Sequence, residues 1–333
     1  MNLPGNLPCI FKQMELRVMS GYAYAVARVR ALENRLLAPN RWERLTAAES
    51  AKEAWRVLSE TTYSRWQENR SFYQYEEIFW DELRSTADLL RRMTKEGSFF
   101  HSYLLKYDMH NLKVYLLARI TGFSGKRTPV SSYEGNKVWE IMKNPQRFKG
   151  DPFARAVIVL QEQELSDPQE LQRAVDLLYY EYMAGRKKDF SPGLKDFWAC
   201  LVDLVNLRTL LRVKVMKKEE DFLARFLLPG GYVPEKEFLP VLMWTMEEIK
   251  NWWYWRPTGR LAAGLENFYP LWRVEKAADE LLAGRFETFR RRSFGEEPLF
   301  AYFRAKEQEV RKLRVILAAK INRLPAEEWK ERI

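Results

Sequence analysis

The apolar positions of this 333-residue chain recur with the period of an α-helix over most of its length. The first clear stretch, residues 20–37, spaces them alternately by three and four positions. Its apolar residues are Tyr22, Ala25, Val29, Leu32 and Leu36. This narrow stripe is typical of a helix that packs along a partner helix. Because no stretch shows the convincing alternation of a half-buried β-strand, the pattern predicts an all-α protein.

Polar residues and helix breakers locate several helix ends. Thr46 followed by Glu49 has the spacing of a capping box, which predicts that a helix begins there. Asp167 followed by Pro168 is typical of an N-cap and the first helical position. Proline and glycine predict breaks at residues 121–129, 149–152, 191–193, 228–234, 256–259 and 323–325.

One helical sequence occurs three times, as YDMHNLKVYLLARI (107–120), VDLVNLRTLLRVKV (202–215) and QEVRKLRVILAAKI (308–321). Each copy has a carboxylate, a leucine followed by a proximal base, a second leucine, and a distal base eleven positions after the carboxylate. In chain order these residues are Asp108, Leu112, Lys113, Leu116 and Arg119; Asp203, Leu207, Arg208, Leu211 and Lys214; and Glu309, Leu313, Arg314, Leu317 and Lys320.

The repeat extends beyond this helix. Ahead of each copy lies a lead-in helix with an acidic, leucine-rich centre, and ahead of that a helix carrying tryptophan. The three carboxylates are separated by 95 and 106 residues, which suits a domain of several helices better than a short solenoid repeat. We therefore predict three similar helical modules, at residues 1–122, 123–225 and 226–333, with the helix at 20–37 added in front.

The charges of the repeated helix suggest contacts between modules. Within one copy the carboxylate and the distal base lie about 16 Å apart along the axis, so they cannot pair with each other. Around a pseudo-threefold axis, a distal base could reach the carboxylate of another copy. We therefore predict inter-module ion pairs of Arg119, Lys214 and Lys320. The alternative is that each charge projects into solvent beside the leucine stripe.

Composition adds limits on partners and compartment. The chain has 55 Lys and Arg against 45 Asp and Glu, a net charge of +10, which either keeps the protein soluble or attracts an anionic partner. Acids are interspersed with the bases, so a nucleic-acid-binding face is not predicted. Two distant cysteines favour a reducing compartment. We find neither a signal peptide nor a stretch of the roughly 20 apolar residues that a membrane span needs.

The sequence offers no catalytic, metal or cofactor site. A G-x-x-x-x-G-K-[ST] loop for nucleotide phosphates is missing, and the two histidines, His101 and His110, belong to no metal-binding spacing. A helical, aromatic-rich chain also suggests a terpene-synthase-like enzyme, but the clustered aspartates that hold magnesium in such enzymes are missing. We therefore expect neither enzymatic activity nor a cofactor.

The stretch at 21–37, the three repeated helices and the C-terminal segment EVRKLRVILAAKINRLPAEEWKERI (309–333) resemble signature stretches of one family. That family is the C subunit of the archaeal and bacterial V-type (A-type) ATPase, which is similar to the d subunit of the eukaryotic vacuolar enzyme. The resemblance covers nearly the whole chain and runs in the same order and spacing.

The resemblance implies a funnel of three similar helical domains around a pseudo-threefold axis. It further implies a non-catalytic central-stalk subunit, present once per complex and peripheral on the cytoplasmic side of the membrane. Such a socket seats the rotor shaft subunits and rests on the proteolipid ring, so that ATP hydrolysis or synthesis is linked to ion transport. The alternative is a scaffold of three helical modules with a different partner.

Two further features have open interpretations. The basic run RFETFRRRSFGEE (285–297), with Arg290, Arg291 and Arg292, is either solvated surface or a docking site for acidic ring loops or anionic headgroups. The aromatic run NWWYW (251–255) either packs inside the protein, the interpretation we favour, or forms a patch at a membrane or partner boundary.

Overall fold

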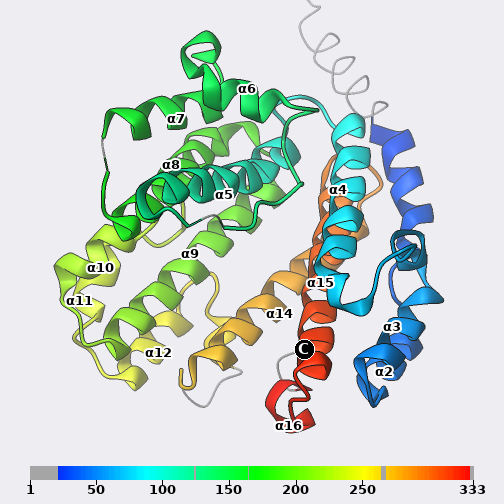
Figure 1. Cartoon of the computed structure of the whole chain (residues 1–333). Helices are drawn as coiled ribbons and strands as arrows, with labels where there is room; N and C mark the ends of the chain where they lie inside the picture. Colours follow the sequence, from blue (N-terminus) through cyan, green and yellow to red (C-terminus); the bar gives the residue numbers. More distant parts are fainter. Residues whose placement is uncertain (1–21, 124, 164, 264–267, 331–333) are drawn as a thin grey trace, which may run out of the picture. The chain divides into compact units, whose positions relative to one another are not determined.

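A computed structural model describes residues 22–123, 125–163, 165–263 and 268–330 of the chain. All regular elements in these ranges are helices (Figure 1), which confirms the prediction of an all-α protein. Within the described ranges, no helix is long and apolar enough to cross a lipid bilayer.

Contacts divide the chain into two compact units. Unit 1 combines residues 1–101 with 286–333, and unit 2 comprises residues 102–285. The boundaries fall inside α5 (Phe99–Thr121) and α14 (Leu271–Arg290). Unit 1 therefore joins the two ends of the chain, whereas the three modules predicted from the sequence follow each other along it. The three modules remain a prediction about the repeat.

Unit 1 is built around two long helices, α4 and α15, which pack against each other. The first residues of α5 also pack on α15: Phe99 and Phe100 meet Phe300 and Phe303 edge to face, with ring centroids 4.9 and 5.2 Å apart. Besides a helix at 22–33, the elements of this unit are α2 (Pro39–Ala47), α3 (Ala51–Ser59), η1 (Thr62–Trp66), η2 (Phe72–Gln74), α4 (Tyr75–Met93), α15 (Glu297–Ile321) and α16 (Ala326–Trp329).

The long helix α9 (Pro192–Val215) is the most deeply buried element of unit 2. Its Trp198 is buried against Tyr179 and Tyr180 of α8, with ring centroids 5.8 and 5.3 Å away. Besides parts of α5 and α14, the other elements are α6 (Lys137–Lys143), η3 (Pro145–Phe148), α7 (Pro152–Glu162), α8 (Pro168–Arg186), η4 (Lys187–Asp189), α10 (Glu220–Phe226), η5 (Glu235–Glu237), α11 (Phe238–Val241), α12 (Met246–Tyr254) and α13 (Arg260–Ala263).

The predicted helix starts are confirmed in one case and wrong in the other. Asp167 caps α8 by accepting a hydrogen bond from the backbone N–H of Gln169, as predicted. Thr46 instead lies inside α2, and α3 is capped by Ser50, whose hydroxyl accepts from Glu53 N. Ser50 and Glu53 have the same three-residue spacing as Thr46 and Glu49, four positions further along the chain. The spacing alone therefore could not distinguish the two pairs.

The front helix spans residues 22–33, and the predicted residues 20 and 21 lie outside the described ranges. Tyr22, Ala25 and Val29 are buried, as the stripe predicts, while Leu32 and Leu36 are only half-buried. The helix ends four residues before the predicted end at residue 37, and Leu36 lies beyond it.

Candidate functional site

The three copies of the repeated sequence lie on α5, α9 and α15, the longest helices described. Their carboxylates are all buried: Asp108 and Asp203 have no exposed surface, and Glu309 has 5%. A buried charge is costly unless it is hydrogen-bonded or paired, so the partners of these three groups show what the repeat does.

In the first two copies, the carboxylate holds a loop further along the chain, which comes directly after α5 in the first copy and after the short helix α10 in the second. Asp108 accepts from the backbone N–H of Ser132 at 2.8 Å and from the hydroxyls of Ser131 and Ser132 at 2.6 Å. Asp203 accepts from the backbone N–H groups of Tyr232 and Val233 at 2.9 and 3.1 Å. Both loops lead from one predicted module into the next.

An asparagine three positions after each of these carboxylates fixes the same loop at a second point. Asn111 exchanges two hydrogen bonds with the backbone of Thr128, at 2.9 and 2.8 Å. Asn206 does the same with Leu228, at 2.8 and 2.9 Å. The anchored segment lies five residues further from its carboxylate in the second copy than in the first. Its two anchor points are four residues apart in both copies. The extra residues are therefore absorbed before the anchored segment.

The loop around Asp203 approaches the carboxylate so closely that it needs glycine. A Cβ atom on Gly231 would lie 2.1 Å from Asp203 Oδ1, well inside van der Waals contact. Burial raises the pKa of Asp203 to about 6, although the two backbone N–H groups and the charges of Lys187 and Arg256 lower it in part. Its Oδ2 atom has no hydrogen-bond partner among the described residues.

In the third copy, the carboxylate holds a segment far back in the sequence. Glu309 accepts from the backbone N–H of Leu37 at 2.6 Å, just after the front helix, and from the Tyr63 hydroxyl at 2.8 Å. It also pairs with Lys306 Nζ at 2.7 Å. The first two copies each anchor the entry to the next module, and the third anchors the entry to the first.

Lys306 joins Glu309 to a second buried carboxylate. The lysine is fully buried and lies 3.2 Å from Glu82 of α4. Glu82 also accepts from Trp66 Nε1 at 2.8 Å and from Arg65 at 2.6 Å. Burial disfavours its ionised form, but Lys306, Trp66 and Arg65 together outweigh this and lower its pKa. The network is therefore charged and fully partnered.

The proximal bases of two copies form ion pairs with the lead-in helix of another module. Lys113 of α5 lies 2.5 Å from Asp176 of α8, and Arg314 of α15 lies 2.9 Å from Glu76 of α4. The order is again cyclic, because the first copy pairs with the second module and the third copy pairs with the first.

The second copy also pairs with the lead-in helix of the next predicted module, but through a different base. Arg212, one helical turn after Arg208, pairs with Glu275 of α14, the lead-in helix of the third module. Arg208 itself is half-buried, and no carboxylate of the described residues lies within ion-pair distance of it. Its positive charge opposes the rise that burial and Asp176 cause in the pKa of Tyr180.

The ion pairs predicted for the distal bases are wrong. Lys214 Nζ donates to the backbone carbonyl of Leu242 at 2.8 Å, and Lys320 Nζ donates to the carbonyls of Thr46, at 3.2 Å, and Ala48. Both lysines therefore close the end of a short helix or turn. Backbone carbonyls near a helix C-terminus are natural partners for a cation, because they carry partial negative charge.

Arg119, the distal base of the first copy, is exposed and has no carboxylate partner in the described part of the chain. The three copies are therefore alike in their carboxylates and differ in their distal bases. Ion pairs between the predicted modules come instead from Lys113, Arg212 and Arg314.

All three copies also end alike. The residue fourteen positions after the carboxylate has a positive φ in each copy: Gly122 at 70°, Lys217 at 54° and Arg323 at 54°. This left-handed residue ends the helix and lets the next backbone N–H groups reach its last carbonyls. Lys218 N, for example, donates to Val213 O at 3.1 Å, and Leu324 N to Ala319 O at 2.9 Å.

Comparison with known proteins identifies the family of this chain. The sequence model of the ATP synthase (C/AC39) subunit family matches residues 25–332. The chain belongs to this family. The family is one of non-catalytic stalk subunits of V/A-type ATPases, as the resemblance in the sequence indicates.

Individual relatives are distant but cover the chain almost completely. The chain is 21% identical to the C subunit of the V-type sodium ATPase of Enterococcus hirae, over 92% of this chain and 95% of the relative. It is 26% identical to the C subunit of the A-type ATP synthase of Thermococcus kodakarensis, over 89% and 86%. It is 24% identical to the same A-type ATP synthase component of Archaeoglobus fulgidus, over 93% and 95%.

The arginine run of this C/AC39-family chain is partly occupied by internal ion pairs. Arg290 lies 3.1 Å from Glu33 and 3.0 Å from Glu287, and Arg292 lies 2.5 Å from Glu297. Arg291 is exposed and has no ion pair within the described ranges. Of the three arginines predicted to contact the ring or headgroups, Arg291 is thus the one whose side chain needs no rearrangement to bind a partner.

The aromatic run at 251–255 divides between the two interpretations. Trp253 is fully buried and packs with Trp252 and Phe238, at centroid distances of 5.6 and 6.1 Å. Tyr254 and Trp255 are 52% and 83% exposed. Packing therefore explains the middle of the run, and its end remains a candidate boundary patch.

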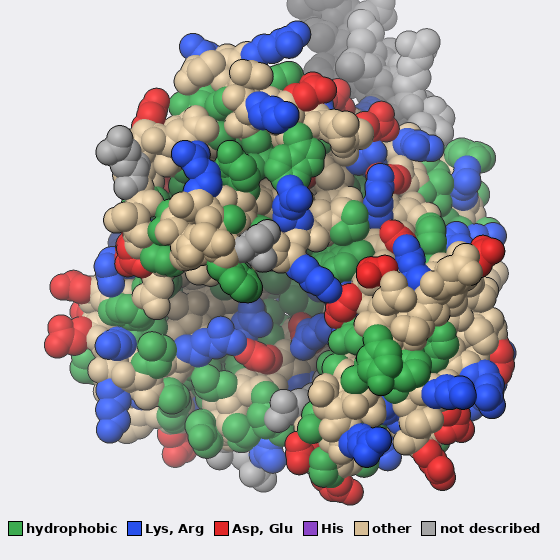
Figure 2. Space-filling view, in the orientation of Figure 1, with side chains coloured by type: hydrophobic (Ala, Val, Ile, Leu, Met, Phe, Trp, Pro, Cys, Tyr) green, Lys and Arg blue, Asp and Glu red, His purple; other side chains and the backbone are tan. Residues whose placement is uncertain are grey.

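Two general features bear on ligands. Within the described ranges, no group of three or more His, Cys, Asp or Glu residues is arranged to hold a metal ion. Figure 2 shows Lys and Arg side chains interspersed with Asp and Glu on the face in view, as the sequence predicts.

Proposed function

We propose that this chain is the socket of a V/A-type rotary ATPase, which couples the rotor shaft subunits to the membrane proteolipid ring. It would be present once per complex, on the cytoplasmic face, as a funnel of three modules at residues 1–122, 123–225 and 226–333. The coupled complex links ATP hydrolysis or synthesis to ion transport. Family membership over residues 25–332 supports this role.

The cyclic order of anchors carries the proposal. Asp108 and Asp203 fix the entries to the second and third modules, and Glu309 fixes the entry to the first. A part that transmits torque must not deform between its two partners. Buried, charge-assisted hydrogen bonds at each module entry are a physical means to that end, because each is costly to break.

The ends of the repeated helices are candidate partner contacts. Each left-handed helix end has one or two exposed apolar side chains beside it, which a partner would cover. These residues are Ile120 and Phe123, Val215 and Met216, and Leu324. We assign them, with Arg119 and Arg291, to contacts with the shaft or the ring and its headgroups.

The test is to separate hydrolysis from transport. Inverted membrane vesicles from a strain lacking this chain are compared with vesicles to which the purified chain has been returned. We expect the deletion to abolish ATP-driven ion uptake and the returned chain to restore it, while the headpiece hydrolyses ATP in both. Ion uptake that stays coupled to hydrolysis without the chain would refute the socket role.

A further inference from the structure

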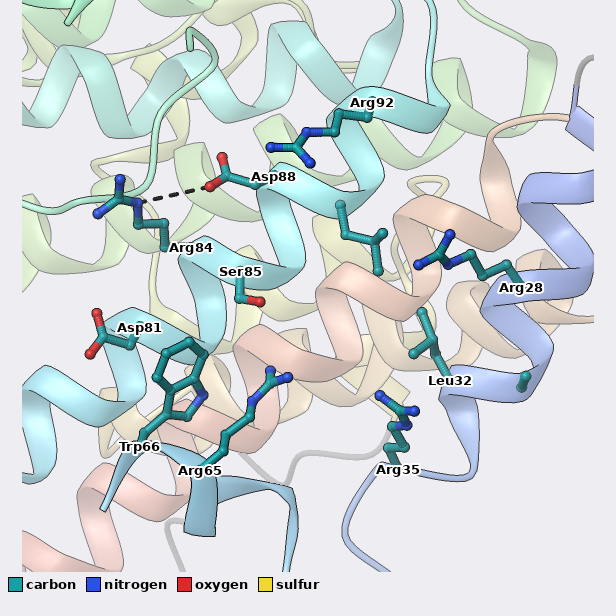
Figure 3. A pocket seen from close by; sticks show the side chains of 12 residues that line it. Arg28, Leu32, Arg35, Arg65, Trp66, Asp81, Arg84, Ser85, Asp88 and Arg92 are labelled. Carbon is teal, nitrogen blue, oxygen red and sulfur yellow. Dashed lines mark ion pairs between the residues drawn. The ribbon is translucent and has the colours of Figure 1, made fainter. Parts of the chain in front are cut away.

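An arginine-rich pocket lies in unit 1, away from the repeated carboxylates. Its volume is about 710 Å³, and it lies between the front helix, η1 and α4 (Figure 3). It is lined by Arg28, Ala31, Leu32, Arg35, Arg65, Trp66, Asp81, Arg84, Ser85, Asp88, Leu89 and Arg92. The α4 residues among them recur every three or four positions, so they form one continuous face of that helix.

The pocket carries a surplus of positive charge. Five arginines line it against two aspartates, and both aspartates already have partners. Asp81 lies 2.6 Å from Arg70, and Asp88 lies 3.1 Å from Arg91 and 3.8 Å from Arg84. An incoming anion would therefore meet little repulsion from either carboxylate.

Three of the five arginines have no carboxylate partner among the described residues: Arg28, Arg35 and Arg92. Arg28 donates only to the Tyr24 hydroxyl, at 3.0 Å. A fourth, Arg65, stacks over Trp66 at 4.7 Å while it pairs with Glu82. In Figure 3, Arg35 and Arg65 project toward the space that α4 borders. Arg28, Arg35 and Arg92 are solvent-exposed, so an anion that enters the pocket can reach them without displacing a carboxylate.

The arrangement of the arginines along the pocket favours an elongated anion. Arg28 and Arg35 are seven residues apart on the front helix and the turn after it, and Arg84 and Arg92 are eight apart on α4. Along a helix these separations correspond to about 10–12 Å, too far for one phosphate group to bridge. Half-buried Leu32 and Leu89 line the same pocket, one from each of these two segments. Carboxylates two helical turns apart, about 11 Å, with an apolar residue between them match this layout.

We infer that this pocket docks an acidic helical segment of another protein, with a row of carboxylates over the arginines and one apolar side chain between Leu32 and Leu89. Arginine and tryptophan around an apolar centre are typical of the residues that dominate protein interfaces. The inference rests on the proposed function in one respect, because we take the segment to come from another subunit of the rotary complex.

The experiment is site-specific photocrosslinking in the native host. A benzophenone amino acid replaces Leu89 in the full-length tagged chain, membranes are irradiated, and crosslinked peptides are identified by mass spectrometry. The same is done with Arg28→Glu/Arg35→Glu, with the milder Arg28→Gln/Arg35→Gln, and with Lys143→Glu/Arg155→Glu. The last is a matched control that reverses two exposed charges in unit 2. Circular dichroism verifies that each variant is folded.

We expect the crosslink to fall on a helical segment with several carboxylates. Its yield should fall by about tenfold or more in the Glu variant, less in the Gln variant and not in the control. A crosslink to lipid, to a small phosphorylated molecule or to a non-acidic segment would overturn the inference, as would a yield that survives charge reversal.

The outcomes also separate this inference from the proposed function. If shaft and ring co-purify but Leu89 crosslinks to no protein, the pocket assignment is wrong and the socket stands. If the acidic segment belongs to a protein outside any rotary ATPase, the pocket assignment stands and the socket role is wrong.

Discussion

The buried lysine of the third copy is the most sensitive point of the anchoring network. Lys306 is completely buried between Glu309 at 2.7 Å and Glu82 at 3.2 Å. Replacing it with methionine keeps the volume but leaves two buried carboxylates without their shared cation. Breaking a buried pair in this way costs about 3–5 kcal/mol, because the remaining charge is uncompensated.

Hydrogen exchange followed by mass spectrometry measures this loss of stability within unit 1. At pH 7.5, peptides of α4 and α15 in Lys306→Met should lose about two to three and a half orders of magnitude of protection, since each 1.4 kcal/mol is a factor of ten. Peptides of α9 in unit 2 serve as the internal reference.

A triple variant separates charge from packing. Lys306→Met with Glu82→Gln and Glu309→Gln removes all three charges while the amides keep acceptors for Trp66 and Leu37. We expect it to regain most of the lost protection. A single variant within about 1 kcal/mol of the original chain, or a triple variant no better than the single, would show that the network does not stabilise unit 1.

Three smaller perturbations test the rest of the repeat. Burial raises the pKa of Asp203 to about 6 from 3.8, so its ionised form destabilises the fold. Between pH 4 and 7 the chain should lose about 2 kcal/mol relative to Asp203→Asn, measured by urea unfolding of both. Gly231→Ala should weaken protection of the 228–233 loop through the clash with Asp203, whereas Gly150→Ala, in open space, should not. Lys217→Gly should raise stability by about 1 kcal/mol, since glycine adopts the left-handed helix end without strain, and Lys217→Ala should not; equal melting temperatures for the two would contradict this.

The helices themselves were predictable because burial leaves a periodic signal. The stripe from Tyr22 to Val29 and the cap at Asp167 need only local rules, and both are present. The three copies were recognisable because carboxylate, leucines and bases recur at fixed spacing. These features are encoded within one or two helical turns.

The partners of the repeated charges were not predictable in the same way. Lys214 and Lys320 bind backbone carbonyls, and Asp203 binds backbone N–H groups. Almost every residue type carries these groups, so the sequence does not indicate which residue is the partner. A spacing argument looks for opposite charges and therefore proposed carboxylates for the lysines. The double glycine of the 228–234 loop was a usable signal, because only glycine permits so close an approach to Asp203.

The arginine pocket depends on topology alone. Its arginines are scattered between positions 28 and 92 and belong to three separate elements. Each looks like ordinary solvated charge in the sequence. Only the packing of the front helix and η1 beside α4 brings them together.

Affinity capture of the tagged chain from mild-detergent membranes of its host, with the partners identified by mass, tests the central claim most directly. Our account predicts that shaft subunits, a nucleotide-hydrolysing headpiece and a small proteolipid co-purify, with one copy of this chain per complex. Recovery of the chain without shaft or proteolipid, bound instead to an unrelated partner, would contradict the socket and favour a triplicated helical scaffold.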